Sequence, residues 1–406
     1  MHRAELAFWL RLTLTPGVGN ESARKLLAAF GLPDGIFQQP ASALLQVVSS
    51  AQAAALASVP PELDKLLDAT WNWLQGRPAN DPDAPCRRIV TLGDPLYPAS
   101  LLTMHDPPLV LYLLADPATG DDADQAPASS GAMAMLQRGF ADGMAIVGSR
   151  NPTPQGSANA RQFAKALAQA GLTVVSGMAL GIDGAAHEGA LDALESEPGR
   201  LATIAVVGTG LDRVYPKSHL ELARRIARRG LILSEYPIGT PPLEANFPKR
   251  NRLIAALSKG TLVVEAALKS GSLITARLAA EQGKDVFAIP GSIHSTQSRG
   301  CHALIKQGAK LVESAQDVLE ELHWTGSTGT ATGPVASADR ETANTPHPGD
   351  QDALLLALGF DPVGLDALQA RTGMPTASLQ ARLMALELDG HVARLPGGLF
   401  QRIATA

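Results

Sequence analysis

Two hydrophobic patterns divide most of the chain into regions. In residues 1–80, apolar side chains recur at three- and four-residue spacing, as in ESARKLLAAFG and LDKLLDATWNWLQG, which predicts helices. In residues 81–323, short apolar runs such as MAIVGS, LTVVSG and LATIAVVG alternate with amphipathic segments such as SANARQFAKALAQAG. Strands that are apolar throughout, separated by helices, predict a Rossmann-like, doubly wound, mostly parallel α/β sheet that is covered on both faces.

The remaining segments differ in composition. Residues 324–349 are rich in Gly, Ser, Thr and Pro and predict a flexible linker, and a similar stretch at about 116–132 predicts a disordered insertion. Residues 350–406 show three helical segments followed by a hairpin pattern around Pro396-Gly397-Gly398, which is the layout of a winged helix. We therefore expect four parts, of which the first is a helical domain resembling a SAM or helix-hairpin-helix module.

Charge and cysteine content narrow the class of protein. The net charge of −5 means that any nucleic-acid binding must come from a local basic patch. The two cysteines, Cys86 and Cys301, cannot form a disulfide framework and fit a reducing compartment. The sequence shows neither a signal peptide nor an apolar stretch long enough to span a membrane, so we expect a cytoplasmic protein with no membrane partner.

Small residues gather where the predicted strands end. In a doubly wound sheet, ligands bind beyond the carboxyl ends of the strands, where helix N-termini present free N–H groups to anions. Four strand ends rich in Gly and Ser on one sheet favour an extended phosphate backbone as the ligand over a single nucleotide. The alternative is that these small residues serve only to form tight turns. The candidate residues at these strand ends are Gly148, Ser149, Arg150, Gly177, Gly208, Gly210, Ser272 and Thr275.

Basic residues are concentrated in one region of this acidic chain. Lys217 follows Tyr215, and the segment NFPKRNR places Phe247 and Asn251 among Lys249, Arg250 and Arg252. Aromatic rings among cations suit base stacking combined with phosphate contact, so these residues are candidates for binding single-stranded DNA. The arginines of HLELARRIARRG are better explained as a solvated helix face.

Catalytic patterns are weak. Asp183 and His187 share a helix face and form a conceivable acid–base pair, but a helix cap and a buried hydrogen-bonding histidine explain them better. Glu265 lacks the glycine-rich phosphate loop of a nucleotide hydrolase, and the chain contains neither a P-loop nor a dinucleotide-binding fingerprint. The sequence therefore predicts no catalytic group, metal site or cofactor.

Each of the two flanking domains has two possible roles. TLTPGVGNESARKLLAAFG resembles a helix-hairpin-helix in which Gly17-Val18-Gly19 would face a DNA phosphate, but a module kept for packing or protein contacts explains it equally well. The winged helix carries six acidic residues against four arginines over residues 350–406. This acidity favours a partner-binding module over a major-groove reader.

Several motifs resemble the DNA-processing protein A family, also called DprA or Smf. They are VGSRNPT, VVSGMALGID, GTGLDRVYPKSH, NFPKRNRLIAALS and VVEAALKSGSLITA, and the resemblance covers about residues 90–320. It implies a non-enzymatic, homodimeric protein that binds and protects incoming single-stranded DNA and loads RecA during natural transformation. By motif, Arg150 and Lys217 are the implied DNA contacts, and residues 249–252 match the F-P-x-R-N-R block.

His219 and His302 depart from the resemblance, because the family usually has Asn at both positions.

Two rival functions remain. One is a nucleoside-monophosphate phosphoribohydrolase on a related Rossmann-like fold, and the other is a sequence-specific regulator acting through the winged helix.

Overall fold

The computed structural model describes residues 1–76, 84–116, 131–195, 199–326, 353–360 and 362–403. The predicted insertion at 116–132 and the predicted linker at 324–349 lie almost entirely outside the described residues. No described helix is long and apolar enough to cross a membrane.

A nine-stranded sheet forms the centre of the molecule, in the order β1-β2-β6-β5-β4-β3-β7-β8-β9. The strands from β6 to β9 in this order are mutually parallel, whereas β1 pairs antiparallel with β2, and β2 with β6. The predicted mostly parallel α/β fold is therefore confirmed. The strands are β1 (Cys86–Thr91), β2 (Val110–Ala115), β3 (Gly143–Val147), β4 (Thr173–Ser176), β5 (Thr203–Val206), β6 (Leu231–Ser234), β7 (Gly260–Val263), β8 (Asp285–Ala288) and β9 (Lys310–Leu311).

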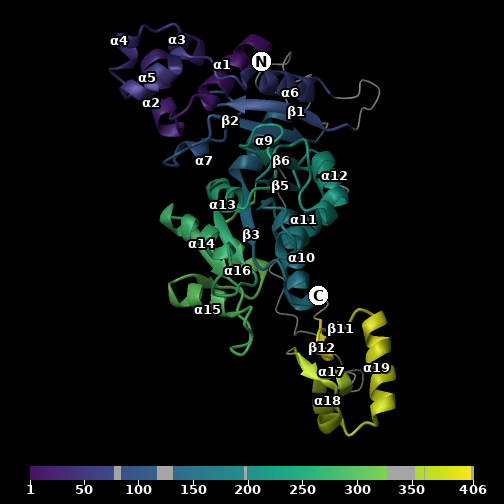
Figure 1. Ribbon diagram of the computed structural model, residues 1–406. Coiled ribbons are helices and arrows are strands. Elements are labelled where there is room, and N and C mark those ends of the chain that lie inside the picture. Colours follow the sequence, from purple (N-terminus) through teal and green to yellow (C-terminus); the bar gives the residue numbers. More distant parts are fainter. Residues whose placement is uncertain (77–83, 117–130, 196–198, 327–352, 361, 404–406) are drawn as a thin grey trace.

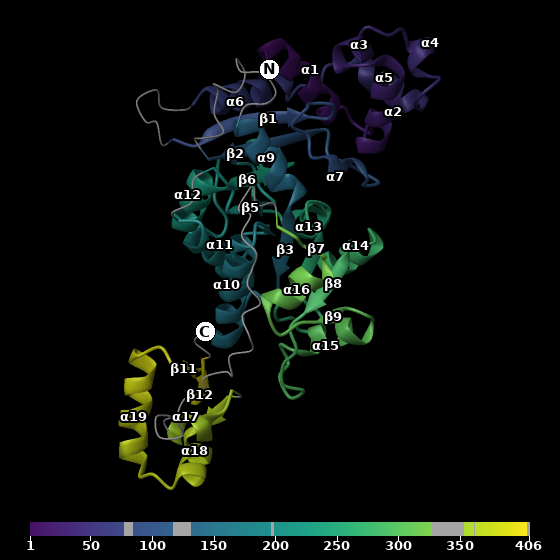
Figure 2. The same cartoon turned by 180° about the vertical axis from the view of Figure 1, so that it is seen from behind.

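Helices cover both faces of this sheet, as Figures 1 and 2 show from opposite sides. Side chains alternate along each strand, so Met144 and Ile146 of β3 pack under one helical layer while Ala145 and Val147 pack under the other. The first layer contains α10 (Pro154–Gln169), α11 (Ile182–Ala193), α12 (Leu220–Arg229) and α16 (Ala315–Glu321). The second contains α7 (Ala99–Leu102), α9 (Gly131–Ala141), α13 (Asn246–Ala256), α14 (Ser272–Glu281) and α15 (Arg299–Lys306).

The N-terminal helices share a core with the antiparallel edge of the sheet. Leu6, Trp9 and Leu10 pack together with Ile89 of β1 and Tyr112 of β2, so this part is joined to the sheet by continuous apolar packing. The helices are α1 (Arg3–Leu14), α2 (Asn20–Phe30), α3 (Pro33–Phe37), α4 (Ala41–Leu44), α5 (Ser50–Ala57) and α6 (Leu63–Gln75). Gly17-Val18-Gly19 connects α1 to α2, and a DNA contact there stays a prediction.

The C-terminal segment has its own small core and sheet, with Leu354, Leu368, Leu379 and Leu383 buried together. Its three strands follow the order β10-β12-β11, and Gly397 and Gly398 turn the hairpin with positive φ. In both views it lies beyond α10, at the opposite end of the molecule from the N-terminal helices (Figures 1 and 2). Its elements are α17 (Ala353–Leu358), β10 (Val363–Gly364), α18 (Leu365–Thr372), α19 (Thr376–Leu388), β11 (Val392–Leu395) and β12 (Leu399–Arg402).

Candidate nucleic-acid interface

The connections of the sheet create a crevice between β3 and β7. From β3 the chain proceeds through β4 and β5 to β6 on one side, then returns to β7 on the other side and continues to β8 and β9. The loops that follow β3 and β7 therefore diverge, and such switch points are where doubly wound sheets bind ligands. A pocket of about 640 Å³ opens at this position.

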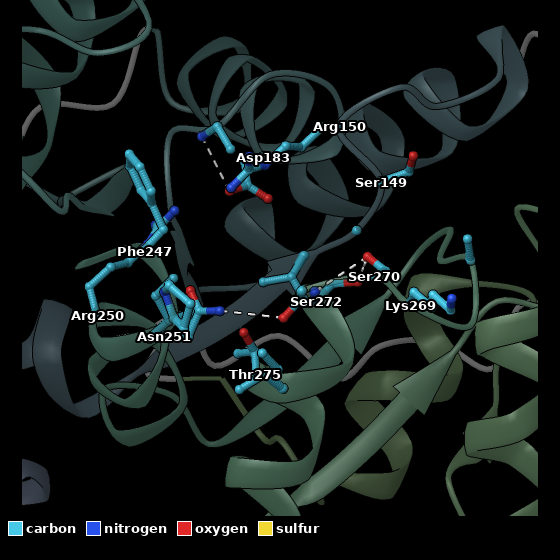
Figure 3. Close-up of a pocket in the computed structure, with 18 of the residues that line it drawn as sticks. Ser149, Arg150, Asp183, Phe247, Arg250, Asn251, Lys269, Ser270, Ser272 and Thr275 are labelled. Carbon is cyan, nitrogen blue, oxygen red and sulfur yellow. Dashed lines mark hydrogen bonds between the residues drawn. The ribbon is translucent and has the colours of Figure 1, made fainter. Parts of the chain in front are cut away.

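Segments from across the parallel sheet line the pocket (Figure 3). The loop after β3 contributes residues 148–151, and α13 contributes Phe247, Arg250 and Asn251. The loop after β7 and the first turn of α14 contribute Lys269, Ser270, Gly271, Ser272 and Thr275. Residues that were predicted at separate strand ends thus line a single concave surface. This surface is centred on the ends of two strands, β3 and β7.

A cation and two aromatic rings form one wall. The Phe247 ring lies 5.5 Å from the Tyr215 ring between centroids, and the Arg150 guanidinium lies 5.7 Å from the Phe247 centroid. Arg150 is exposed, and Tyr215 is 47 % exposed. The exposed Tyr215 ring and the half-buried Phe247 ring, beside an exposed guanidinium, offer a stacking surface together with a bidentate anion partner.

The N-terminus of α14 forms the opposite wall. The Ser270 and Ser272 hydroxyls lie 2.7 Å apart, and Asn251 Nδ2 donates to the Gly271 carbonyl at 3.4 Å. Helix α14 begins at Ser272, and its first three backbone N–H groups donate to acceptors of Ser270 and Gly271 at 3.1–3.4 Å. The donors that this wall offers to phosphate oxygens are therefore the hydroxyls of Ser270, Ser272 and Thr275.

Arg250 forms the floor of the site. Its side chain is only 4 % exposed and donates from Nη1 to the Val206 carbonyl at 2.7 Å. Burial raises the pKa of Asp183, and the positive charge of Arg250 opposes that rise. A Cβ on Gly177 would lie 1.6 Å from Nη1 of Arg250, so this glycine leaves space for the guanidinium. Both Arg250 and Gly177 were predicted to contact the DNA strand. In the structure they support the pocket from beneath instead.

Arg252 is also placed differently from the expectation. Its guanidinium pairs with Glu235 and lies 3.4 Å from Asp106 Oδ2, and the side chain is 16 % exposed. Because its charge is neutralised within the protein, Arg252 joins α13 to the loops after β6 and before β2. Lys217 and Lys249 are exposed outside the pocket lining, where they remain candidate contacts for a strand longer than the pocket.

The other glycines permit close packing. A Cβ on Gly148 would lie 2.9 Å from the Glu265 carbonyl oxygen, and a Cβ on Gly210 would lie 2.5 Å from Asp212 Oδ1. Gly208 is buried beneath α13, where its carbonyl accepts from Asn246 Nδ2 at 3.0 Å. Of these three, only Gly148 lines the pocket. Turn and packing geometry therefore explains Gly208 and Gly210.

The sequence interpretation missed Asn151 and Gln297 in the lining. Asn151 is the direct neighbour of the predicted Arg150, so its position carried a usable signal. Gln297 reaches the pocket from the loop after β8, where its Nε2 donates to the Asn151 carbonyl at 3.0 Å. No sequence pattern identifies it.

The residues weighed for catalysis have structural partners. Asp183 lies in the first turn of α11, whose N-cap is Gly181, so the expectation of an Asp183 cap was wrong in position. Its Oδ2 instead accepts from Ala179 N at 3.3 Å. The Glu265 carboxylate accepts from the backbone N and Oγ1 of Thr153, the N-cap of α10, at 2.9 and 2.6 Å. The described residues contain no cluster that could hold a metal ion.

His187 is a buried hydrogen-bonding histidine, as expected. Its Nδ1 lies 2.7 Å from Thr203 Oγ1, and Thr203 donates to the Val174 carbonyl, so His187 donates from Nδ1. Burial lowers the pKa of His187 to about 3, with smaller contributions from His219 and Arg250.

This histidine predicts a pH dependence of stability. The unfolded chain takes up a proton at this histidine near pH 6.5, whereas the folded chain does not. The free energy of unfolding is therefore highest above that pH and decreases as the pH falls towards 3. Between pH 6.5 and 5 the loss from this group is about 2 kcal/mol. Urea unfolding of His187→Gln should show a shallower pH dependence, whereas His294→Gln, an exposed loop histidine, should match the original protein. Equal slopes in all three proteins would contradict this assignment.

The two histidines at family-atypical positions make backbone contacts. His219 Nδ1 lies 3.1 Å from the Met178 carbonyl, which joins the segment after Lys217 to the loop between β4 and α11. His302 Nε2 lies 3.0 Å from the Gly291 carbonyl. Both imidazoles therefore serve as hydrogen-bonding groups beside the loops of the site.

The fold and the pocket define a Rossmann-like protein with an open pocket, lined by aromatic and cationic side chains, at the switch point of its sheet. Residues 88–323 match the model of the DNA recombination-mediator protein A family, and residues 338–398 match the DprA winged helix domain. The chain belongs to the DNA recombination-mediator protein A family.

Comparison with individual relatives supports the same family assignment. Protein Smf of Synechocystis is 32 % identical over 99 % of this chain and 100 % of its own length. Protein Smf of Escherichia coli is 43 % identical over 63 % of this chain, and the match spans 66 % of that relative. The solved structure of DNA processing protein A from Streptococcus pneumoniae superposes with a TM-score of 0.59 at 34 % identity, covering 79 % of this chain and 98 % of that one.

Proposed function

We propose that this protein binds single-stranded DNA in the pocket between β3 and β7 and acts without catalysing a reaction. The observation that carries the proposal is the wall formed by Arg150, Phe247 and Tyr215 opposite the α14 N-terminus. A single strand presents both of the groups that these walls suit, since its bases are free to stack and its phosphates are negatively charged. Membership of a family named for DNA recombination mediation supports the same ligand.

We propose further that the bound strand is incoming DNA, which the protein protects and transfers to RecA during natural transformation. In this proposal the protein works in the cytoplasm as a homodimer. The acidic winged helix would then serve as a partner-binding module. These statements rest on the family resemblance and require separate tests with purified RecA and by analytical ultracentrifugation.

The first test compares the strand preference of the full chain. Fluorescence anisotropy should give tighter binding of a labelled oligo-dT strand than of a duplex of equal length. The affinity should decrease steeply with salt, because each neutralised phosphate releases counterions. Equal affinity for both forms, or binding that is insensitive to salt, would contradict the proposal.

Lys217→Ala provides a milder prediction about the length of the site. Because Lys217 is exposed outside the pocket lining, it should contact a long strand and not a short one. Its removal should weaken binding of a long oligo-dT by about tenfold and lower the salt slope by about 0.7, the value for one phosphate contact on a single strand. A dinucleotide should bind the variant and the original protein equally.

The phosphoribohydrolase alternative is disfavoured by Glu265. Both carboxylate oxygens are hydrogen-bonded to Thr153, and the residue is not part of the pocket lining. Incubation with AMP, followed by chromatography for adenine, tests this alternative directly. We expect no adenine above a protein-free control.

A further inference from the structure

The last helix of the C-terminal domain, α19, is apolar on two opposite sides. Leu379, Leu383 and Leu386 are buried in the core of the domain. On the other side, the side chains of Met384 and Leu388 are 64 % and 79 % exposed. A surface helix normally turns polar side chains to water, whereas a helix that is apolar all round is usually buried. The outer side of α19 therefore has the composition of a covered surface.

The exposed apolar residues of α19 follow a regular spacing. They are Ala377, Ala381, Met384 and Leu388, at intervals of four, three and four residues, and we call them the outer stripe. These intervals are those by which two helices of a coiled coil keep their apolar side chains facing each other. Helix α19 lies along the outer edge of the C-terminal domain in both views, so the outer stripe faces away from the rest of that domain (Figures 1 and 2).

Neither DNA nor the preceding segment of the chain suits the outer stripe. In helix-turn-helix domains the second helix of the pair, which corresponds to α19, enters the major groove and reads it with polar and cationic side chains. The only cation between Thr376 and Leu388 is Arg382, which at about 100° per residue points well away from the stripe. Residues 327–352 contain a single large apolar side chain, Val335, so by composition they offer little to cover it.

The outer stripe is complementary to a second copy of itself. If two α19 helices run antiparallel and cross between positions 381 and 384, Ala381 lies opposite the partner's Met384, and Ala377 lies opposite the partner's Leu388. Each layer then combines a small side chain with a large one, so every layer can be filled. A parallel pair would instead place alanine opposite alanine and leave space in those layers.

Polar residues beside the outer stripe agree with the antiparallel arrangement. Gln380 and Glu387 are both exposed and lie seven residues apart on the same side of the stripe. In the antiparallel pair, Glu387 comes within about 3 Å, measured along the helix axis, of the partner's Gln380, whose amide can donate to the carboxylate. The two copies of Glu387 lie about 13 Å apart along the axis, so these like charges do not meet.

We propose that the outer stripe of α19 binds the outer stripe of a second copy of this chain in an antiparallel pair. This inference rests on the proposed role of the winged helix as a partner-binding module, and it names the surface and the partner. One pair of 13-residue helices is a small contact compared with the roughly 1,200–2,000 Å² of a stable interface. We therefore expect a reversible contact that forms when copies are already held close together.

The test uses the full chain with one cysteine introduced at a chosen position. In the antiparallel pair the two copies of residue 381 lie about 4.5 Å apart along the axis, so Ala381→Cys should form a disulfide between copies under mild oxidation. The two copies of residue 377 lie about 16 Å apart, so Ala377→Cys should not. Ala370→Cys, at an exposed position on α18, measures chance collision. Cys86 and Cys301 are buried and should stay reduced in every variant.

Non-reducing gel electrophoresis gives the rate of cross-linking for each variant. We expect Ala381→Cys to cross-link at least about tenfold faster than Ala370→Cys and Ala377→Cys, because pairing raises the local concentration of the thiols. A rate for Ala381→Cys no higher than that for Ala370→Cys would overturn the proposal. Equal rates for Ala377→Cys and Ala381→Cys would also overturn it, since a parallel pair gives that result.

Adding Leu388→Gln to Ala381→Cys tests the packing of the outer stripe. Leu388 is exposed in the single chain, so its replacement should leave the circular dichroism spectrum unchanged. The contact is symmetric, so the replacement removes a large side chain from two layers at once, and cross-linking should slow by at least about tenfold. An unchanged rate would show that the outer stripe is not the contact. The reaction contains neither DNA nor RecA, so this inference and the proposed DNA binding fail separately.

Discussion

Arg150→Ala should lower the affinity of the protein for oligo-dT by about ten- to a hundredfold without unfolding it. A hydrogen bond between a charged donor and a phosphate contributes about 1.5–3 kcal/mol, and each 1.4 kcal/mol corresponds to a factor of ten. Arg150 is exposed and its main described contact is with the Phe247 ring, so its loss leaves no buried group without a partner. The effect should appear in binding and not in the free energy of unfolding.

Two further variants make this prediction specific. Arg150→Lys keeps the charge but loses the planar fork, so we expect an intermediate affinity. Arg228→Ala removes an equally exposed arginine from α12, outside the pocket lining, and should bind like the original protein. Equal affinity of Arg150→Ala and Arg228→Ala would show that the pocket is not the DNA site.

Phosphate contact and stacking can be separated in the same assay. Against a strand with abasic sites, the original protein should lose the stacking contribution, about 1–3 kcal/mol per base. Arg150→Ala should still lose its phosphate contribution on that strand. An Arg150 effect that disappears on abasic DNA would assign this residue to base recognition.

The fold was predictable because its signals are local. Strands such as Met144–Val147 are apolar at every position since both faces are covered, and the helices between them turn an apolar side towards the sheet. The location of the candidate site also followed from local information, because Gly148 to Arg150 lie directly after β3, and Gly271 to Thr275 lie where the loop after β7 enters α14. The small β10 strand was not expected, since two residues give no periodicity.

The roles of the basic residues on α13 were not predictable in the same way. Consecutive residues of a helix point in directions about 100° apart, so Lys249 to Arg252 cannot face one ligand together. Phe247 and Asn251, four residues apart, face the pocket, whereas Arg250 points beneath it and Arg252 points towards Glu235. The partners of the two arginines come from distant segments. Only the folded chain shows which charges remain free.

Gly177→Ala should destabilise the protein far more than an ordinary glycine substitution, by about 3–5 kcal/mol. The new Cβ would lie 1.6 Å from Nη1 and 2.2 Å from Cζ of Arg250, so the guanidinium must move away. Its departure takes the Arg250 donor from the Val206 carbonyl. It also takes from the Asp183 carboxylate, which is only 7 % exposed, the positive charge that opposes the rise of its pKa. A buried charge that loses its partner accounts for the size of the effect.

Gly271→Ala is the matched control. This glycine lies in the same domain with a negative φ, and a Cβ there would meet no atom within 4 Å. Its replacement should change stability by less than about 1 kcal/mol, in the stabilising direction, because alanine restricts the unfolded chain. Urea unfolding of both variants provides the comparison.

A double-mutant cycle then distinguishes a clash with Arg250 from a general intolerance of side chains at position 177. Arg250→Ala should itself be strongly destabilised, because Asp183 stays buried without a counter-charge. In that background the space of the guanidinium is free, so adding Gly177→Ala should cost less than about 1 kcal/mol, well short of additivity. Additive losses would mean that Gly177 is required for its backbone alone and not for the space it leaves to Arg250.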